Sequence, residues 1–513
     1  MGLLELREEV VKRPLAVKNG GLKAGIDIVL LNPRDASSLG VLPGERVQII
    51  CGRCACGAIP VVSESAPEGT IIVSDSLIEK IRINACSEAL VVPLGMPSSS
   101  DYLLRRMKGE RLGAKEIKNI ISDVVQGYYD DAGIAAFLVA QYIHGMSEDE
   151  LEYLIRAMVE TGVVVEFGEP VYDEHSIGGV PGNSKVALLA VPIVASTGLL
   201  IPKTSSRAIT SPAGTADTME VLARVAFAPE ELRDIAKKTR GVLAWGGSLN
   251  LAPADDIFVR IERKLMIDPP AQVVASILSK KLAMSVSTLV LDIPVGHGAK
   301  IESEAEAEKL ASLFLQQAGR LGMRIRVALT YAGEPIGHTA GPALEAREAL
   351  ETLARGRGSL SLVTKACSLA GILLEMAGVA ASGRGEELAC RILRTGEAYK
   401  KFREIVEAQE GDPDIKPEDI EVGSYTYTLE ATAEGAVTSI YNRAITLIAR
   451  AAGAPEDKKA GVYLHVKTGY RVRKGDPLLT IHASSKAKLK EALQALAENP
   501  PIMIEGMLLK TIP

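Results

Sequence analysis

Two neighbouring segments carry residue types that bind anions. The first, residues 173–185, reads DEHSIGGVPGNSK, and its glycines would let backbone amides converge just before an apolar stretch that suits a helix. Amides at the start of a helix form a ready site for an anion. The segment matches neither the dinucleotide-binding GxGxxG pattern nor the Walker pattern, so it indicates neither of those nucleotide sites. A plain tight turn is the alternative.

The second segment, residues 201–217, is rich in hydroxyl groups. It reads IPKTSSRAITSPAGTAD, and Lys203 and Arg207 stand among its serines and threonines. Many hydrogen-bond donors with little acceptor charge suit the oxygens of a phosphate group. A solvated Ser/Thr loop is the alternative, which is less attractive because two such segments occur so close together.

A third group could supply acid–base chemistry. Ser276 and Lys280 lie in the run SILSKK, and Asp268 precedes Ser276 by eight residues. A carboxyl group near a base could act as a general acid if burial kept it protonated. Because Asp268 stands directly before two prolines, it could equally cap a helix.

Three of the six cysteines form a compact run. Cys51, Cys54 and Cys56 lie in CGRCAC, which resembles half of a zinc knuckle. No second CxxC or histidine pair follows at metal-binding spacing. Buried thiols or a local disulfide are therefore favoured over a structural zinc site.

Composition narrows the class of protein. The 58 Lys and Arg residues against 64 Asp and Glu give a net charge of −6, and only 4% of the 513 residues are aromatic. Both values argue against a nucleic-acid binder, which needs a basic face and stacking rings, but not against a small anionic substrate. With no long apolar run and no secretory signal pattern, we expect a cytoplasmic protein without a membrane span.

Elements that would position these residues alternate along the chain. Residues 1–97 predict a β-rich domain, with strands near 24–30, 45–50 and 69–73, and residues 96–101 predict a linker that ends in a helix cap. Residues 98–170 predict the first part of a helical domain, because apolar residues recur at helical spacing over 117–125 and 151–158. Its expected caps are Asp130–Asp131 and a capping box from Ser147 to Glu150.

Residues 171–425 predict a central α/β domain with inserted helices. Strands are expected at 287–293 and 323–329, and between them a helix from Ser303 to Gly319, with Glu306 at capping-box spacing and Gly319 as its stop. Residues 426–513 predict a β-rich C-terminal domain of α/β-barrel-like form. The expected class is therefore a multidomain α/β and α+β protein, with a small helical domain and an α/β phosphate-binding domain between β-rich ends.

Ordered motifs carry a family resemblance over residues 101–490. They are DEHSIGG, PKTSSR followed by GT, LAPAD at 251–255, SILSKKLA at 276–283, GEPIGHTAGPALEAREALETL at 333–353 and GVYLHVKTGYRVRKGDPLLTIHA. In order and spacing they resemble the thymidine/pyrimidine-nucleoside phosphorylase family. GGVPGN and KTSSRAITS are similar to its archaeal AMP phosphorylase branch, which carries an extra N-terminal domain.

The resemblance implies a pentosyltransferase of nucleotide salvage. AMP and phosphate would give adenine and ribose 1,5-bisphosphate, with phosphate as a substrate and no metal or other cofactor. It also implies a homodimer through the helical unit, or a higher homo-oligomer. The alternatives are a nucleoside phosphorylase acting on uridine, cytidine, guanosine or thymidine, an anthranilate phosphoribosyltransferase-like enzyme, and a non-catalytic nucleotide-binding paralogue.

The resemblance also assigns roles to single positions. Asp268 matches the proton donor of the family. The positions that match AMP-binding residues are Gly179, Ser206, Arg207, Ala208, Ile209, Thr210, Ser211, Thr215, Ser276 and Lys300. The positions that match phosphate- or base-adjacent residues are His175, Ser176, Ser205 and Lys280.

Four positions depart from the bacterial pattern. Lys300 stands where nucleoside enzymes have an aromatic residue, and a cation there suits a substrate with a 5′-phosphate. Glu174 replaces the family's lysine, and a carboxylate beside phosphate would repel it, so another cation substitutes or the substrate differs. Ser184 reads as an inserted residue that could let Lys185 move in. Ile261 falls where bacterial members have the arginine that reads pyrimidine, which argues against strict thymidine use.

Overall fold

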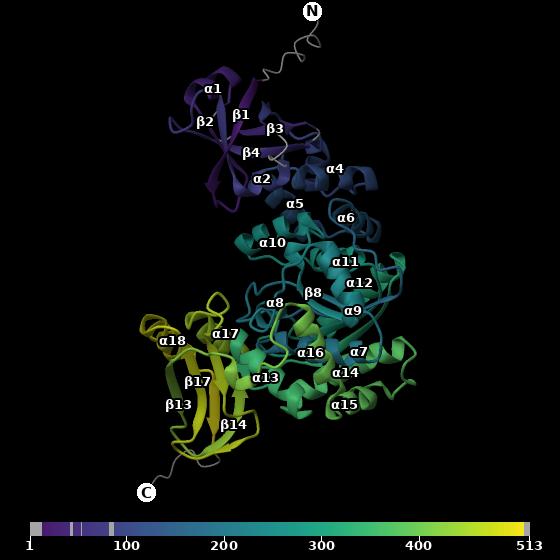
Figure 1. Ribbon diagram of the computed structural model, residues 1–513, viewed down its shortest axis with the longest axis vertical. Helices are drawn as coiled ribbons and strands as arrows, with labels where there is room; N and C mark the ends of the chain where they lie inside the picture. The colour runs from purple at the N-terminus through teal and green to yellow at the C-terminus, as the bar shows by residue number, and fades with distance from the viewer. Residues whose placement is uncertain (1–12, 42–44, 53, 82–86, 507–513) are drawn as a thin grey trace, which may run out of the picture. The chain divides into compact units, whose positions relative to one another are not determined.

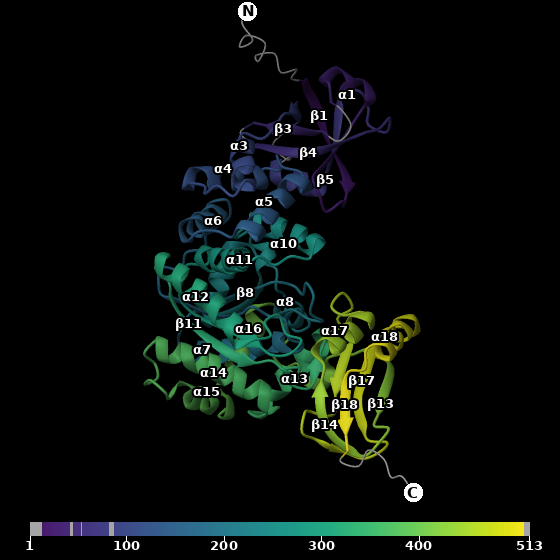
Figure 2. The ribbon, with the colours of Figure 1, turned by 180° about the vertical axis from the view of Figure 1, so that it is seen from behind.

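The computed structural model describes residues 13–41, 45–52, 54–81 and 87–506 (Figures 1 and 2). The chain divides into two compact units. The first contains residues 1–162 and 252–279, and the second contains residues 163–251 and 280–513.

The first unit opens with a closed β-barrel, drawn in purple in Figure 1. Its strands, in the order β1-β5-β2-β4-β3-β6, are β1 (Arg13–Leu22), β2 (Ile28–Leu31), β3 (Arg46–Cys51), β4 (Cys54–Val62), β5 (Thr70–Ser74) and β6 (Glu88–Leu94). Two short helices, α1 (Pro33–Leu39) and α2 (Asp75–Ile81), accompany them. Alternate residues of β3, such as Val47 and Ile49, are fully buried, which is the period of a strand with one face inward. The expected β-rich N-terminal region is confirmed.

The barrel also contains the cysteine run. Cys51 is disulfide-bonded, but its partner is neither Cys54 nor Cys56, so the local disulfide suggested within this run is not formed. Cys54 and Cys56 are free, and burial raises the pKa of the Cys56 thiol to about 12. Cys86 lies outside the described residues.

The rest of the first unit is helical. Its helices are α3 (Ser100–Met107), α4 (Ala114–Val125), α5 (Asp131–His144), α6 (Glu148–Glu160), α10 (Pro253–Leu265) and the larger part of α11 (Pro270–Ala283). Asp130 caps α5, and Ser147 with Glu150 forms the expected capping box of α6. The cap expected at the end of the 96–101 linker is wrong. Ser99 precedes α3, but its hydroxyl donates instead to the buried carboxylate of Asp123, at 2.8 Å.

Parallel strands form the centre of the second unit. β10 (Val286–Val295) pairs in parallel with β11 (Arg324–Tyr331) on one side and β7 (Val171–Ser176) on the other. β8 (Ile201–Ser205) pairs in parallel with β9 (Gly241–Trp245), and a parallel bridge from Val171 to Leu200 joins the two sets. The segments that follow β7, β8 and β10 therefore leave the same edge, where ligands bind in open α/β sheets.

Helices pack around these strands. They are α7 (Val186–Ser196), α8 (Thr215–Met219), α9 (Pro229–Thr239), α12 (Glu304–Arg320), α13 (Pro342–Arg355), α14 (Leu360–Met376), α15 (Gly385–Arg394) and α16 (Glu397–Ala408). Nearly every residue of α7 is buried in the core. Among described residues no single helix is long and apolar enough to span a membrane, although α13 and α14, bent by 73°, pass that test of length and composition as a pair.

The end of α12 corrects an expectation. Ser303 caps the helix by accepting from the amide of Glu306, but the helix runs through Gly319 to Arg320. The stop is Gly322, whose φ of 75° places it in the left-handed region while the amide of Met323 bonds back to Ala318. This is the usual helix-ending role of glycine, three residues later than predicted.

The C-terminal part of the second unit consists of two sheets and two helices (Figure 2). One sheet has the order β12-β15-β17-β13 and the other β16-β14-β18. The elements are β12 (Thr339–Ala340), β13 (Tyr425–Glu430), β14 (Gly435–Ile440), α17 (Asn442–Ala451), β15 (Gly461–Leu464), β16 (Arg471–Val472), β17 (Pro477–Ala483), α18 (Lys486–Glu498) and β18 (Ile502–Glu505). In the described part of the chain neither of these sheets closes into a barrel, whereas the N-terminal sheet does.

Candidate phosphate- and nucleotide-binding site

The loop after β7 requires glycine for two reasons. Gly178, Gly179 and Gly182 all have φ between 76° and 88°, which favours glycine. A Cβ on Gly179 would lie 2.7 Å from Cβ of Lys300, and one on Gly182 would overlap the carbonyl oxygen of Ile336. The structure therefore packs the glycine loop directly against the segment that carries Lys300, two regions that the sequence analysis assigned to one site.

Four buried charges lie at the end of β7 and beside it. Lys281 contacts Asp173 at 2.6 Å, and Lys203 contacts Glu174 at 3.2 Å and Asp173 at 3.7 Å. None of these side chains is more than 4% exposed. Burial lowers the pKa of Lys281, whereas Glu174 and Asp173 outweigh burial and raise the pKa of Lys203. Two cations thus balance two carboxylates, and Lys203 neutralises Glu174.

His175 follows this cluster directly. Burial, and then the charges of Lys281, Lys203 and Lys280, hold the pKa of His175 well below its ordinary value, so the ring is neutral. Its Nδ1 atom is buried and has no hydrogen-bond partner among the described residues. A neutral imidazole can donate from one nitrogen and accept at the other, so it suits a phosphate oxygen. Its neighbour Ser176 accepts from the amide of Gly178 at 3.2 Å.

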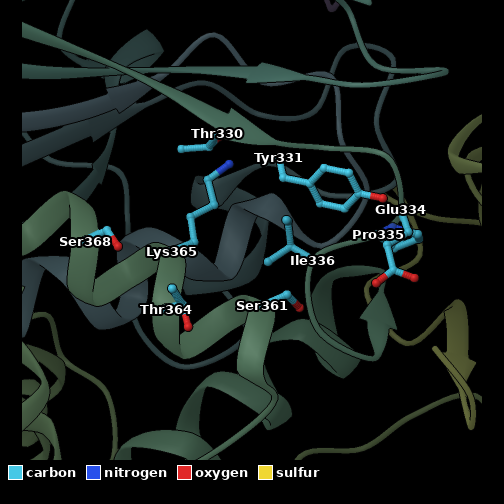
Figure 3. A pocket seen from close by; sticks show the side chains of 9 residues that line it. All are labelled: Thr330, Tyr331, Glu334, Pro335, Ile336, Ser361, Thr364, Lys365 and Ser368. Carbon is cyan, nitrogen blue, oxygen red and sulfur yellow. The ribbon is translucent and has the colours of Figure 1, made fainter. Parts of the chain in front are cut away.

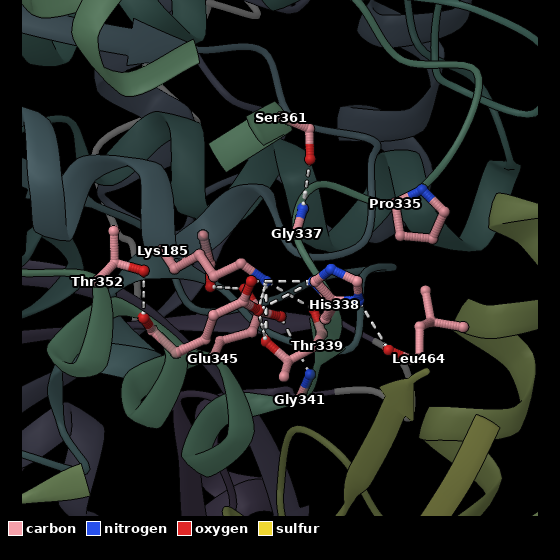
Figure 4. Close-up of polar contacts among 12 residues, drawn as sticks. Lys185, Pro335, Gly337, His338, Thr339, Gly341, Glu345, Thr352, Ser361 and Leu464 are labelled. Carbon is pink, nitrogen blue, oxygen red and sulfur yellow. Dashed lines mark hydrogen bonds and ion pairs between the residues drawn. The ribbon is translucent and has the colours of Figure 1, made fainter. Parts of the chain in front are cut away.

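Lys185 does not take the place of the family's lysine. Its ammonium group is fully buried and contacts the carbonyl and hydroxyl oxygens of Thr339 and the carboxylate of Glu348, each at 2.9 Å (Figure 4). Ser184 is also buried, and its hydroxyl contacts Thr218 at 2.6 Å and donates to Glu345. The suggested insertion therefore anchors the start of α7 to α8 and α13 and supplies no cation to the loop.

The loop after β8, residues 206–214, is held through its charged residues. Arg207 binds Glu220 with two nitrogens at 2.5 and 2.6 Å, contacts Asp217 at 3.2 Å and lies 4.8 Å above the ring of Trp245. Asp217 also accepts from the amides of Ala208, at 2.7 Å, and Gly214, at 3.1 Å. Arg207 was expected to bind substrate, but in this structure its guanidinium is engaged with these two carboxylates.

Other predicted residues of this loop present backbone and hydroxyl groups. Ser206 and Thr210 are exposed. The carbonyls of Ile209 and Ser211 accept from Arg450 of α17, at 3.3 and 3.2 Å. Ser205 and Thr215 frame the loop. The hydroxyl of Thr215 donates to the carbonyl of Ser184 at 3.2 Å, which ties this loop to the glycine loop.

Asp268 and Ser276 belong to the first unit. Ser276 donates its hydroxyl to Asp255 at 2.8 Å. Asp268 is exposed, so the burial that the sequence argument required for an acid is not observed. α11 begins at Pro270, and the first amides of the helix bond to the carbonyl of Pro269. Lys280 lies one turn beyond Ser276 on α11, in the stretch assigned to the second unit.

Sequence reasoning missed several residues that shape the site. Asp173 and Lys281 form a buried pair, and Asp217 holds the loop 206–214. From α17, Asn442 contacts the carbonyls of Ala332 and His297, and Arg450 contacts the loop 206–214. One signal was available, because a run of charged residues in a strand between apolar neighbours indicates buried pairing. No sequence signal pointed to Asn442 or Arg450, because only the fold brings these residues close to segments that are far away in sequence.

A cavity of about 250 Å³ opens at the carboxyl end of β11 (Figure 3). Its lining residues are Thr330, Tyr331, Glu334, Pro335, Ile336, Ser361, Thr364, Lys365 and Ser368. Lys365 is ion-paired with Asp292 at 2.9 Å, so the charge is already balanced. None of the lining residues is among those predicted to bind substrate.

Three family models match consecutive parts of the chain. Residues 100–162 match the glycosyl transferase family, helical bundle domain, and residues 168–399 match the a/b domain of the same family. Residues 436–503 match the pyrimidine nucleoside phosphorylase C-terminal domain. Anthranilate phosphoribosyltransferase from Thermus thermophilus superposes with a TM-score of 0.52 at 20% identity, over 61% of this chain and 100% of that one. That likeness concerns the fold alone, and it confirms the predicted class.

Curated relatives match almost the whole chain. AMP phosphorylase from Hyperthermus butylicus is 62% identical over 97% of this chain and 99% of its own. AMP phosphorylase from Thermococcus kodakarensis is 49% identical over 94% of this chain and 96% of its own. AMP phosphorylase 1 from Archaeoglobus fulgidus is 46% identical, with 95% and 97% covered.

Proposed function

Because this chain belongs to the AMP phosphorylase family, we propose that it transfers the pentosyl group of AMP to inorganic phosphate. The products are adenine and ribose 1,5-bisphosphate. Full-length similarity to several AMP phosphorylases supports this activity, and the family resemblance drawn from the motifs is confirmed. The glycine loop after β7 is the structural observation that carries the proposal. It offers phosphate the amide of Gly179 and the neutral imidazole of His175, and the nearby carboxylate of Glu174 is paired with Lys203.

The reaction breaks the bond between C1′ of the ribose and the base nitrogen. An oxygen of phosphate forms the new bond to C1′, and the electron pair of the broken bond goes to the departing adenine. A proton donated to the purine ring neutralises that charge, and Asp268 is assigned this role by the resemblance. The sugar passes through an oxocarbenium-like state, so catalysis rests on holding phosphate at C1′ while the base is protonated.

The glycine loop and its neighbours are proposed to bind phosphate. The amide of Gly179, the hydroxyl of Ser176 and the neutral ring of His175 are the proposed donors, because the amides of Ile177 and Gly178 already bond to Asp292 and Ser176. Lys280 is proposed to lie near the base, with Ser276. These groups position and polarise the reactants, and no step is assigned to a metal or organic cofactor.

Lys300 is proposed to bind the 5′-phosphate of AMP. The support is its place, because its backbone packs on Gly179 at the edge of the loop. Replacing Lys300 by Ala should lower kcat/KM for AMP by about ten- to a hundredfold, the range for one charged hydrogen bond. The value for adenosine should stay within about twofold, since adenosine lacks the phosphate. Lys309→Ala, an exposed lysine of α12, is the control.

The same assay separates the alternatives. Phosphate-dependent release of base is measured from AMP, CMP, UMP and the free nucleosides. Equal loss for AMP and adenosine in Lys300→Ala would contradict the role of Lys300, and preference for nucleosides would favour a nucleoside phosphorylase. No phosphate-dependent release from any substrate would favour a non-catalytic paralogue. A cytoplasmic homo-oligomer acting in nucleotide salvage completes the proposal.

A further inference from the structure

One helix of the C-terminal domain contacts two segments of the proposed nucleotide site. One carries Lys300, to which the proposed function assigns the 5′-phosphate, and the other is the loop 206–214, whose positions the family resemblance assigns to AMP binding. α17 has Asn442 at its first position and Arg450 in its last turn. Eight residues of helix separate them by about 12 Å. At one end lies the segment 296–300, which carries Lys300, and at the other the loop 206–214.

Arg450 holds the loop that follows β8. Its Nη1 donates to the carbonyls of Ile209 and Ser211, at 3.3 and 3.2 Å. Those two carbonyls lie in a stretch without helix or strand. The guanidinium therefore fixes backbone that is not held by the hydrogen bonds of regular secondary structure. Lys458, which follows α17, adds a second contact because it binds Asp217 at 2.7 Å and Glu220 at 3.2 Å.

Asn442 holds the segment that carries Lys300. Its side-chain nitrogen donates to the carbonyl of Ala332 at 2.8 Å and to that of His297 at 3.5 Å. Asn442 is 1% exposed, and a Cβ on Gly298 would lie 3.7 Å from its Cβ. The preceding Tyr441 meets the ring of His297 edge to face, with centroids 6.4 Å apart.

We propose that α17 sets the distance between the loop 206–214 and the segment 296–300 that carries Lys300, with Arg450 and Asn442 as positioning residues for AMP. This inference rests on the proposed function. Neither side chain needs to touch the substrate. Each side chain fixes the position of one segment's backbone relative to the other segment. Misplacement by about 1 Å is enough to lower the rate strongly.

The two residues predict different kinetic signatures. Arg450→Met keeps an unbranched side chain but removes both hydrogen bonds, so KM should rise about tenfold for AMP and for adenosine alike. Asn442→Ser releases the segment that carries Lys300, so KM should rise for AMP and change less than about twofold for adenosine. Arg450→Lys retains a cation that can donate a hydrogen bond to the loop. Its KM values should therefore lie within about threefold of those of the wild type.

Steady-state kinetics of the full chain test the inference. KM for phosphate, kcat and the thermal midpoint are measured beside KM for AMP and adenosine. Arg471→Met, an exposed arginine of β16 in the same domain, is the matched control and should behave as wild type. Asn442 is buried, so Asn442→Ser could fail to fold. In that case Arg450→Met alone tests the inference.

Three results would overturn the inference. The first is an unchanged KM for AMP in Arg450→Met. The second is an equal rise of KM for phosphate together with a fall of the thermal midpoint, which would indicate a general structural role. The third is no rescue by Arg450→Lys. Failure of the proposed function is seen separately, as wild-type protein that releases no base from AMP.

Discussion

The glycine loop after β7 and the loop of residues 206–214 after β8 leave the same edge of the sheet but are held by different means. Buried ion pairs lie at the base of the first, where Lys203 and Lys281 meet Glu174 and Asp173 almost out of contact with solvent. Partly exposed pairs hold the second, since the side chain of Arg207 is 36% exposed. In the first loop both partners of each ion pair are buried, whereas in the second the cations are partly exposed and the carboxylate of Asp217 is buried.

The difference has an energetic consequence. Removing one partner of a buried ion pair leaves an uncompensated charge and costs several kcal/mol, whereas an exposed pair contributes about 1 kcal/mol or less. Changes beneath the glycine loop should therefore be seen in the free energy of unfolding. Changes in the second loop should be seen in KM, because its contacts decide where the backbone lies more than whether the protein folds.

The largest expected effect comes from Lys203→Met. It leaves the carboxylate of Glu174 buried without its cation, and the free energy of unfolding should fall by about 3–5 kcal/mol. The double variant Lys203→Met with Glu174→Met removes both charges at similar volume and should recover most of that loss. Urea denaturation measures both. A double variant as unstable as the single one would show that the cluster does not act through charge pairing.

A smaller effect is expected from Ser184→Ala. The change removes the contact with Thr218 and leaves an oxygen of Glu345 without its donor, which should cost about 1–3 kcal/mol. Ser196→Ala is the control, because its hydroxyl only donates to Ile193 within the same helix. Equal unfolding midpoints for the two variants would show that Ser184 does not anchor the loop.

Local sequence patterns predicted the elements well where the cause is local. The capping box of Ser147 and Glu150 depends on only four consecutive residues. The positive φ angles at 178 and 179 were indicated by the residue type, because glycine favours them. The stop of α12 was placed at Gly319 because both that glycine and Gly322 satisfy the same local rule. Only the packing of the last turn decides between them.

The sequence predicted which segments form the site, but not which charged residues pair with one another. Glu174 and Lys203 are 29 residues apart and meet because β7 and β8 lie side by side, which no spacing rule contains. Lys185 was expected to move toward the phosphate loop, yet Thr339 and Glu348, from a segment far along the chain, hold it elsewhere. Residue types indicated which segments belong to the candidate site. The direction of each long side chain, however, depends on neighbours that only the tertiary fold supplies.

His175 offers a test of the first loop through pH. Its pKa is lowered in the folded state, so as pH falls through the ordinary value near 6.5 the unfolded chain binds a proton that the folded chain does not. Stability should therefore decrease below pH 6.5, by about 1 kcal/mol between pH 6.5 and 5.5. Urea denaturation across this range should show a weaker dependence for His175→Gln. His297→Gln, on an exposed histidine, should keep the wild-type slope, and equal slopes for all three proteins would contradict burial of a neutral His175.

The smallest effect on stability, and the sharpest test of the contrast, is expected from Arg207→Met. Since the arginine is partly exposed, the free energy of unfolding should change by less than about 1 kcal/mol. KM for AMP should still rise severalfold, because the two-nitrogen contact with Glu220 fixes the loop. Arg207→Lys should not restore KM, since an ammonium group cannot reproduce the paired contact. If Arg207→Met instead lost as much stability as Lys203→Met, the second loop would be anchored like the first, and exposure would not be what separates them.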